Sequence, residues 1–426
     1  MSEYNVNIVI GANFGDEGKG YVSNALSANK KTLTILPTGG SQRAHTVDCN
    51  NKYYNGRHVY HHFASGTMNG SDTYYGVDFV LNPMEYVREA KELDEMYNFW
   101  ELRTNQYASP KCYVTTPFDM FLNQIKEEYR GEGKHGTCGY GVWETIKRNQ
   151  NSQPRYCLNY EELYHCLSRD YLAKKGIEPI RKKLIDIRDG YFKGEIERHH
   201  ITLSDEWKHI VYDDRIIQHW IMDAKRMCWC IECVDVSYAI SKCKPKNIIF
   251  EFGQGILLDC DNLEYAPHLT CAKTGLDGIS QLWNQDYKSI LHDAKNVNAY
   301  YVTRTYLTRH GIGRLDSECT RNDISDKMEE DKTNVPNPFQ NHLRYAPLDY
   351  DSLIRRIFID SEMYNVDVNI VFTHCNELPV KSEELNNAIQ SYFENDVHVY
   401  EQFSEKESFE NLKNYFLRPL DKSHDM

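Results

Sequence analysis

Several features that define whole classes of protein are missing from this 426-residue sequence. It contains no run of about 20 apolar residues, which a bilayer-spanning helix requires, and its mean hydropathy is −0.66. Acidic residues outnumber basic ones by 62 to 49, which leaves a net charge of −13. Because binding to nucleic-acid phosphates needs clustered Lys and Arg, this balance excludes a broad nucleic-acid surface. We expect small-molecule substrates, and neither a membrane nor a nucleic acid as partner.

The chain also lacks a stretch rich in proline, glycine and serine that would mark a linker between domains. Hydrophobic residues make up 41% of it, which is enough for a large core. We therefore expect one elaborated domain over residues 1–426, with a helical insertion of unclear register at about 150–245.

The thirteen cysteines do not show the paired pattern of a disulfide framework. They are odd in number and scattered, and the first ten residues lack the charged and apolar regions of a secretory signal. Cys228, Cys230 and Cys233, with Cys243 as a fourth ligand, form a poor zinc motif because no second C-x-x-C pair accompanies them. We expect a cytoplasmic protein with reduced thiols.

Short β-branched runs alternate with helix-compatible segments along the chain. Strands are predicted at Asn5–Ile10, Thr32–Leu36, Val77–Leu81, Asn247–Phe252, Ala299–Thr303 and Val366–Phe372, and helices at Tyr21–Ala28, Tyr86–Tyr97 and Tyr350–Ile359. Strands that alternate with helices are typical of a mostly parallel sheet with helices packed on it. The expected fold class is therefore α/β.

The first predicted strand leads directly into a glycine-rich loop, Gly11 to Gly20 (GANFGDEGKG), which precedes a helix. In this position backbone N–H groups and a helix N-terminus can bind phosphates. The loop resembles a P-loop in its placement but not in its spacing, because Gly20 and not a hydroxyl residue follows Lys19. It carries two acids instead, Asp16 and Glu17, which suit metal or proton chemistry. A glycine-rich turn alone can also be a purely structural connection.

Four further motifs follow in order: PTGGSQRAHTV at Pro37 to Val47, HHFASG at His61 to Gly66, TCGYG at Thr137 to Gly141 and FEFGQGILLDCD at Phe250 to Asp261. Together with the first loop they resemble the motifs of adenylosuccinate synthetases in the same order. Residues 150–245 show no readable match. The resemblance implies a P-loop-NTPase-like fold, with a mostly parallel central sheet flanked by helices and with helical insertions.

By this resemblance the protein is a ligase that joins L-aspartate to C6 of a 6-oxopurine nucleotide, IMP or dIMP. Oxide is a poor leaving group, so a nucleoside triphosphate with Mg²⁺ is expected to phosphorylate the 6-oxygen first. Asp16 is the expected base for the N1 proton, and His45 the expected acid at the transferring phosphoryl group. A lone histidine is more often a packed side chain, but the register of His45 with the family motif favours catalysis.

The resemblance assigns the remaining roles residue by residue. The expected catalytic residues are Asp16, His45, Lys19 and Gln254. The expected ligands of the purine nucleotide are Gln42, Thr137, Cys138, Gln254, Leu258, Thr270 and Arg148, and those of the donor nucleotide are Gly15, Glu17, Gly18, Lys19, Gly20, Thr46, His374 and Asn376. The expected aspartate ligands are Arg304, His342 and Arg344, and the expected Mg²⁺ ligands are Asp16 and the carbonyl group of Ala44.

Departures from the family pattern leave both substrates open. The family recognises guanine with a T-K-x-D string, whereas Thr373 to Asn376 reads THCN, and an asparagine amide does not demand guanine. ATP and dATP therefore stay open as donors beside GTP. Of the family's arginine-rich aspartate loop only Arg344 is kept, beside His342, although Arg304, Arg309 and Arg314 can supply cations.

Two other functions remain as alternatives. One is a 2-aminoadenylosuccinate synthetase that uses dGMP with ATP or dATP; the retained Asp16 favours a hypoxanthine base instead. The other is a nucleotide-binding or sensing protein without turnover, which the lost arginines would support. The family resemblance also implies a homodimer in which a cation crosses into the partner's phosphate site, with Lys147 or Arg148 as candidates.

Overall fold

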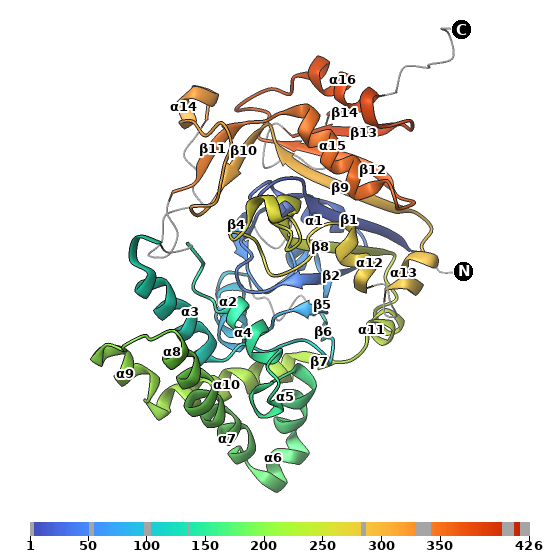
Figure 1. The fold of residues 1–426 in the computed structure, drawn as a ribbon. Helices are drawn as coiled ribbons and strands as arrows, with labels where there is room; N and C mark the ends of the chain where they lie inside the picture. Colours follow the sequence, from blue (N-terminus) through green and yellow to red (C-terminus); the bar gives the residue numbers. More distant parts are fainter. Residues whose placement is uncertain are drawn as a thin grey trace.

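The structure is a computed structural model, and it describes residues 4–50, 55–97, 104–133, 136–282, 287–328, 342–402 and 413–417. Within these ranges, ten strands form one central sheet in the order β14-β13-β12-β9-β1-β8-β2-β5-β6-β7 (Figure 1). Of these ten, only β14, at one edge, runs antiparallel to its neighbour. The expected α/β fold with a mostly parallel central sheet is confirmed.

The strands of this sheet are β1 (Asn5–Gly11), β2 (Thr32–Gly39), β5 (Asp72–Phe79), β6 (Gln106–Ala108), β7 (Ile231–Cys233), β8 (Asn247–Gly255), β9 (Val297–Arg304), β12 (Asp367–Thr373), β13 (Val397–Glu401) and β14 (Lys413–Leu417). Two antiparallel hairpins stand apart from it, β3 (His45–Asn50) with β4 (Asn55–Tyr60) and β10 (Tyr306–Arg309) with β11 (Arg344–Pro347).

Outside the expected insertion, the helices are α1 (Lys19–Ser27), α2 (Pro83–Tyr97), α3 (Pro117–Arg130), α4 (Val142–Asn149), α11 (Val236–Cys243), α12 (Leu276–Leu282), α13 (Lys288–His292), α14 (Arg321–Ile324), α15 (Tyr350–Ser361) and α16 (Ser382–Tyr392). Of these, α14 lies beside β11 and not on the central sheet (Figure 1). The helices of the expected insertion are α5 (Tyr160–Cys166), α6 (Arg169–Lys175), α7 (Glu178–Asp186), α8 (Lys193–Arg198), α9 (Asp205–Val211) and α10 (Asp214–Cys230). None of the described helices is long and apolar enough to cross a membrane.

The central strand β1 explains why both faces of the sheet are covered. Successive side chains of a strand point to opposite faces. Val6, Ile8 and Ile10 pack in a core with residues of α11, α12, α15 and α16. Val9, on the opposite face, packs with Val22 of α1. A strand buried on both sides reads as a continuous apolar run, which is how this strand was predicted.

The predicted strand at Val77–Leu81 is placed wrongly, because the strand runs from Asp72 to Phe79. Tyr74 and Tyr75 are buried in this strand, and tyrosine is frequent in strands. The prediction instead relied on the apolar residues that follow them. Gly76 lies inside this strand, and a Cβ at this position would stand 2.7 Å from the Tyr287 hydroxyl group.

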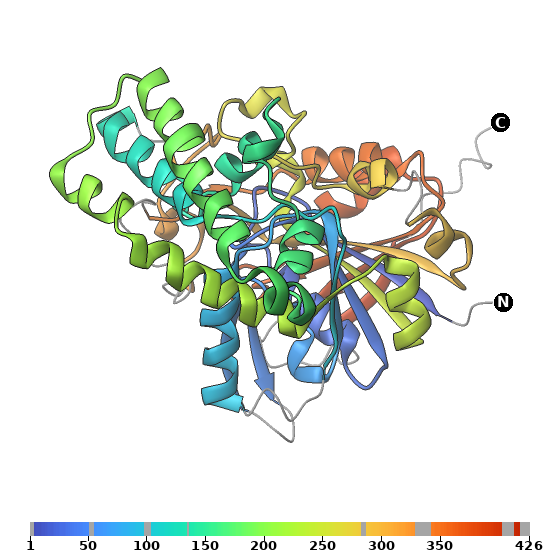
Figure 2. The same ribbon diagram turned by 90° about the horizontal axis from the view of Figure 1, so that it is seen from below.

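The helices α5 to α10 gather at the β7 end of the sheet, opposite the end that carries α15 and α16 (Figures 1 and 2). Arg148, near the end of α4, joins the start of this helical region to the segment around α3. Its guanidinium group is fully buried and donates to both carboxylate oxygens of Asp119, at 2.8 and 2.9 Å. It also donates to the carbonyl oxygens of Val114 and Tyr156, at 2.7 and 2.6 Å.

Arg148 is therefore not a nucleotide ligand, nor a residue that reaches a second subunit, and this expectation is wrong. The donors of its guanidinium group already make hydrogen bonds within the protein. These bonds would have to break before the side chain could bind a substrate phosphate. The sequence around an arginine does not show whether its side chain is buried or faces solvent. The position of Arg148 in the sequence was therefore not enough to predict its role. The neighbouring Lys147 lines the main cavity.

We expect Arg148→Met to destabilise the fold strongly, because the substitution leaves the buried carboxylate of Asp119 without its charge partner. Loss of one member of a buried pair costs about 3–5 kcal/mol. Urea denaturation followed by circular dichroism measures this difference. The matched control is Arg215→Met, which removes an exposed pair with Asp213 and should cost at most about 1 kcal/mol. Equal effects of the two variants would contradict the assigned role of Arg148.

Candidate active site

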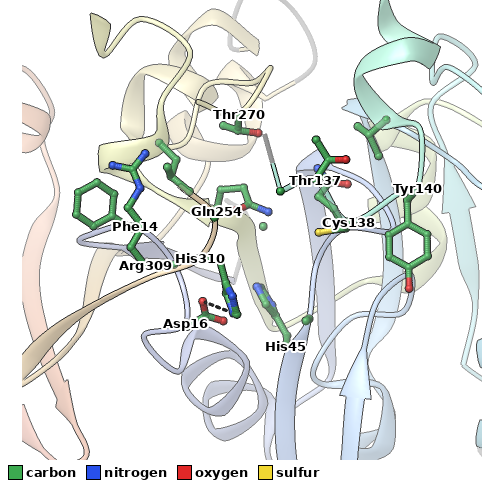
Figure 3. A pocket seen from close by; sticks show the side chains of 18 of the residues that line it. Phe14, Asp16, His45, Thr137, Cys138, Tyr140, Gln254, Thr270, Arg309 and His310 are labelled. Atoms are coloured by element: carbon green, nitrogen blue, oxygen red, sulfur yellow. Dashed lines mark ion pairs between the residues drawn. The ribbon is translucent and has the colours of Figure 1, made fainter. Parts of the chain in front are cut away.

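A cavity of about 1820 Å³ lies at the carboxyl ends of the parallel strands. Its walls come from the segments that follow β1, β2, β8, β9 and β12, and from residues 136–147 on the opposite side. Ligands of open parallel sheets bind at this edge, because the connecting loops and helix N-termini meet there. Figure 3 shows the side chains that converge on it.

Most residues predicted from the sequence lie in this cavity. The predicted residues that line it are Gly15, Asp16, Glu17, Gly18, Lys19, Gly20, Gln42, Ala44, His45, Thr46, Thr137, Cys138, Gln254, Leu258, Thr270, Arg304, His374 and Asn376. Three predicted ligands are not among the lining residues. These are Arg148, described above, and the two residues of the segment around β11, His342 and Arg344.

The expectation that His342 and Arg344 bind aspartate is not met in this arrangement. His342 is exposed. Arg344 pairs with Glu318 at 2.6 Å and donates to the carbonyl oxygen of Gly313. The preceding residues of the corresponding motif, 337–341, lie outside the described ranges. Among the arginines that sequence reasoning proposed as substitutes, Arg309 lines the cavity whereas Arg314 pairs with exposed acids outside it.

Glu17 holds the first loop in shape. One carboxylate oxygen accepts hydrogen bonds from the backbone amides of Asn13 and Gly15, at 3.0 and 2.8 Å, and the other pairs with Lys19 at 2.7 Å. Both side chains of the pair are almost fully buried. Gly15 and Gly18 have φ values of 107° and 95°, which only glycine adopts without strain. Glu17 therefore shapes the loop from within, and Lys19 stays at the cavity wall as its counter-ion.

Asp16 projects from this loop into the cavity. Its φ of 61° lies in the left-handed region, where a non-glycine residue is uncommon. Its carbonyl oxygen accepts a hydrogen bond of 2.7 Å from Nε of Arg304. Its carboxylate oxygen Oδ2 lies 3.6 Å from Nε2 of His310 (Figure 3). The backbone is thus held by Arg304, while the carboxylate remains directed at the cavity.

His45, the first residue of β3, is bound to a buried carboxylate that sequence reasoning did not single out. Its Nδ1 lies 2.6 Å from Glu251 of β8. Nη2 of Arg43 and the hydroxyl group of Ser65 also donate to Glu251, each at 2.6 Å. The Glu251 side chain is fully buried. A charged residue inside the run NIIFEFG was the available signal, because a buried strand tolerates a carboxylate only when donors surround it.

These neighbours set the charge of the imidazole. Burial favours the neutral form of Glu251, but Arg43 and His45 outweigh it and lower the pKa of Glu251 to about 2. Burial, together with the Arg43 guanidinium, lowers the pKa of His45 to about 4, against the raising effect of Glu251. His45 is therefore neutral near pH 7 and donates its Nδ1 proton to Glu251. Its Nε2 is buried and lacks a hydrogen-bond partner among the described residues.

The loop at residues 136–141 faces His45 across the cavity and is held by α3. Glu127 accepts a hydrogen bond from the Gly136 amide at 2.9 Å. Asn123 donates to the hydroxyl group of Thr137 at 3.1 Å, and Gln124 donates to the Gly139 carbonyl oxygen at 3.1 Å. The loop is therefore preformed without a ligand.

The oxygen donors near Asp16 fit a magnesium ion. Mg²⁺ in phosphoryl-transfer sites is bound by one or two carboxylates together with substrate phosphates. Asp16 supplies such a carboxylate, and Ala44, the other expected ligand, is not among the residues with positive φ. Alanine at this position therefore causes no backbone strain.

The cysteine cluster does not fit a zinc ion. Among the described residues, the group of acids, cysteines and histidines close enough to share a metal is Asp259, Cys260 and Asp261, and it does not include the cysteines around β7. Lys273 already pairs with Asp261 at 2.5 Å.

The sequence is similar to that of a known family of enzymes. The family model for adenylosuccinate synthetase matches residues 8–349. The adenylosuccinate synthetase of Psychrobacter sp. (strain PRwf-1) is 27% identical over 324 residues, which cover 73% of this chain and 64% of that protein. The chain thus matches slightly less than two thirds of that relative's length.

Two solved structures are similar in fold. The fully ligated adenylosuccinate synthetase of Plasmodium falciparum has a TM-score of 0.62 at 18% identity, with 97% of this chain and 87% of that chain covered. The succinoaminodeoxyadenylate synthetase of cyanophage S-2L, bound to dGMP and to dATP as energy donor, has a TM-score of 0.61 at 15% identity, with 96% and 95% covered. Since the family model extends over 8–349 of the 426 residues, the chain belongs to the adenylosuccinate synthetase family.

Proposed function

We propose that this protein is a ligase that joins L-aspartate to C6 of IMP or dIMP, after a nucleoside triphosphate has phosphorylated the 6-oxygen. The observation that carries the proposal is the convergence of three side chains on one cavity (Figure 3): Asp16 from the loop after β1, His45 from the start of β3 and Gln254 from the end of β8. A carboxylate, an imidazole and an amide at one point suit proton removal and charge stabilisation on a purine.

In the first step Asp16 accepts the N1 proton, and the 6-oxygen attacks the γ-phosphorus of the donor. The bond to the bridging oxygen breaks, and the nucleoside diphosphate leaves with the electron pair. His45 stabilises the charge that develops on the phosphoryl group. Because the pKa of His45 is about 4 without ligands, its Nε2 gains a proton only when the negative phosphates enter and favour the imidazolium form. Glu251 then stabilises that cation.

In the second step the aspartate nitrogen attacks C6 and inorganic phosphate leaves with the electrons of the C6–O bond. Arg304 and Arg309 are the proposed ligands of the aspartate carboxylates. The Arg309 guanidinium lies 4.4 Å over the ring of Phe14 and donates to the carbonyl oxygen of His268 at 2.9 Å. These neutral partners leave its charge available to a carboxylate, and burial lowers the pKa of Arg309 to about 10.

Asp16 and the Ala44 carbonyl group are the proposed ligands of Mg²⁺, which would neutralise the donor phosphates when bound. Lys19 would contact the same phosphates after release from Glu17. The homodimer also remains a proposal, and Lys147, which lines the cavity, is the cation to test across its interface.

A second candidate function is the synthesis of 2-aminoadenylosuccinate from dGMP. It is favoured by the fold similarity to the cyanophage enzyme, whose structure holds dGMP and dATP. At the donor end, Asn376 is exposed at the cavity wall, where its amide accepts or donates and so does not select guanine. The carboxylate of Asp16 suits a base with an N1 proton, which hypoxanthine and guanine both carry, so it does not separate the two candidate functions.

We expect wild-type protein to form a product from IMP or dIMP with aspartate, Mg²⁺ and one of GTP, ATP or dATP. Phosphate release and product mass measure this in a matrix of the three donors with IMP, dIMP and dGMP. Asp16→Asn and His45→Ala should each lower kcat by roughly 10²-fold or more. Tm should change little for Asp16→Asn but fall for His45→Ala, because the buried Glu251 carboxylate loses one of its donors. A product from dGMP alone would favour the second candidate, and no product in any mixture would indicate a binding protein.

Glu251→Gln tests how the imidazole is held. The amide of glutamine is neutral and can donate to Nδ1, which selects the wrong tautomer, so we expect kcat to fall by roughly 10²-fold or more. Stability should fall as well, because Arg43 loses its charge partner. Ser65→Ala is the control: it removes one donor but keeps the Glu251 charge, and should lower kcat less than about tenfold. Equal losses in both variants would contradict the role of the charge.

A further inference from the structure

The segment from Arg304 to His310 contacts the first loop at Phe14, Gly15 and Asp16. Arg304 donates to the Asp16 carbonyl oxygen at 2.7 Å. The Thr308 hydroxyl group lies 3.4 Å from the Gly15 carbonyl oxygen, and Arg309 covers the ring of Phe14. These contacts hold the loop's backbone and one aromatic side chain. None of these contacts involves the carboxylate of Asp16. The orientation of that carboxylate must therefore be set by another residue.

His310 is the residue that faces this carboxylate. Its Nε2 lies 3.6 Å from Oδ2 of Asp16, and both side chains are partly buried at the cavity wall, 21% and 18% exposed. Figure 3 shows His310 and Asp16 together beside His45. The torsion that turns a carboxylate about its Cβ–Cγ bond is soft, so a fixed backbone does not fix the oxygens. Small errors in the placement of a reacting group can cost a factor of 10² in rate.

We propose that His310 is a positioning residue for the reaction: an N–H at its Nε2 holds Oδ2 of Asp16, so that Oδ1 meets the N1 proton of the purine. The proposal rests on the proposed function. It requires only the N–H, which one neutral tautomer and the imidazolium form both carry. The separation of 3.6 Å is longer than a hydrogen bond, and such contacts tighten when substrates fill an active site.

A purely structural role predicts something different. A partly exposed ion pair stabilises a fold very little, so the removal of His310 should leave Tm nearly unchanged. The proposal predicts a loss in kcat with little change in KM for the purine nucleotide, because His310 does not touch the substrate. The loss should also depend on Asp16 being present.

The test is a double-mutant cycle at saturating Mg²⁺ with Asp16→Asn, His310→Asn and both together. We expect His310→Asn to lower kcat by roughly 10- to 100-fold in the wild-type background, and by less than about twofold when Asp16 is already replaced. His310→Gln should retain more activity than His310→Asn, because the glutamine amide reaches the position of Nε2. The matched control is His292→Asn, which removes an exposed histidine 3.3 Å from Asp293 and should leave kcat unchanged.

Each other outcome contradicts the proposal in a distinct way. Losses that multiply in the double variant would mean that His310 acts independently of Asp16. A loss that disappears at higher Mg²⁺ concentration would assign His310 to metal binding, and a parallel fall in Tm would assign it to the fold. If the wild-type protein makes no product from any purine nucleotide, the proposed function fails and this inference fails with it. An active wild type with an additive cycle rejects only the role of His310.

Discussion

The buried negative charge of Glu251 is the constraint on which the site depends. It lies on β8, between β1 and β2 in the sheet, the two strands that lead to Asp16 and His45. A carboxylate in such a place is stable only when its oxygens are fully bonded. Arg43, His45 and Ser65 provide these bonds: Arg43 precedes β3, His45 begins it and Ser65 follows β4. The need to satisfy one charge therefore joins parts of the chain that are far apart in the sequence.

A second set of polar contacts fixes the part of the cavity wall that the first loop forms. Glu17 closes the first loop from within through the amides of Asn13 and Gly15, and Arg304 secures the same loop from β9. Neither contact needs a ligand, so both walls exist before substrates bind. This agrees with the general requirement that catalytic dipoles be oriented in advance, since reorientation during the reaction would raise the barrier. The donor end is different, because Asn376 stands exposed at its edge.

Local patterns in the sequence were sufficient for the central strands, the first loop and the residues that face the cavity from it. Each of these follows from a short run: apolar residues on a strand buried on both faces, then glycines with positive φ. The pairing of Glu251 with Arg43 is not local, because 208 residues separate the two. The same limit applies to Arg148, whose burial depends on two carbonyl oxygens contributed by other segments. It also explains the omission of His310, which is identified only by its distance from Asp16.

The position of β1 has a consequence for how the protein is made. Its two neighbours in the sheet are β8 and β9, so β1 pairs only with strands that are synthesised more than 200 residues after it. Until β8 (Asn247–Gly255) is synthesised, the apolar strand β1 has no partner, and its second edge stays unpaired until β9 follows. Such edges promote association with other chains. Pairing over this sequence separation is also intrinsically slow. The glycine-rich loop that follows β1 therefore acquires its shape late, and a nascent chain interrupted before β9 lacks Arg304, which holds that loop.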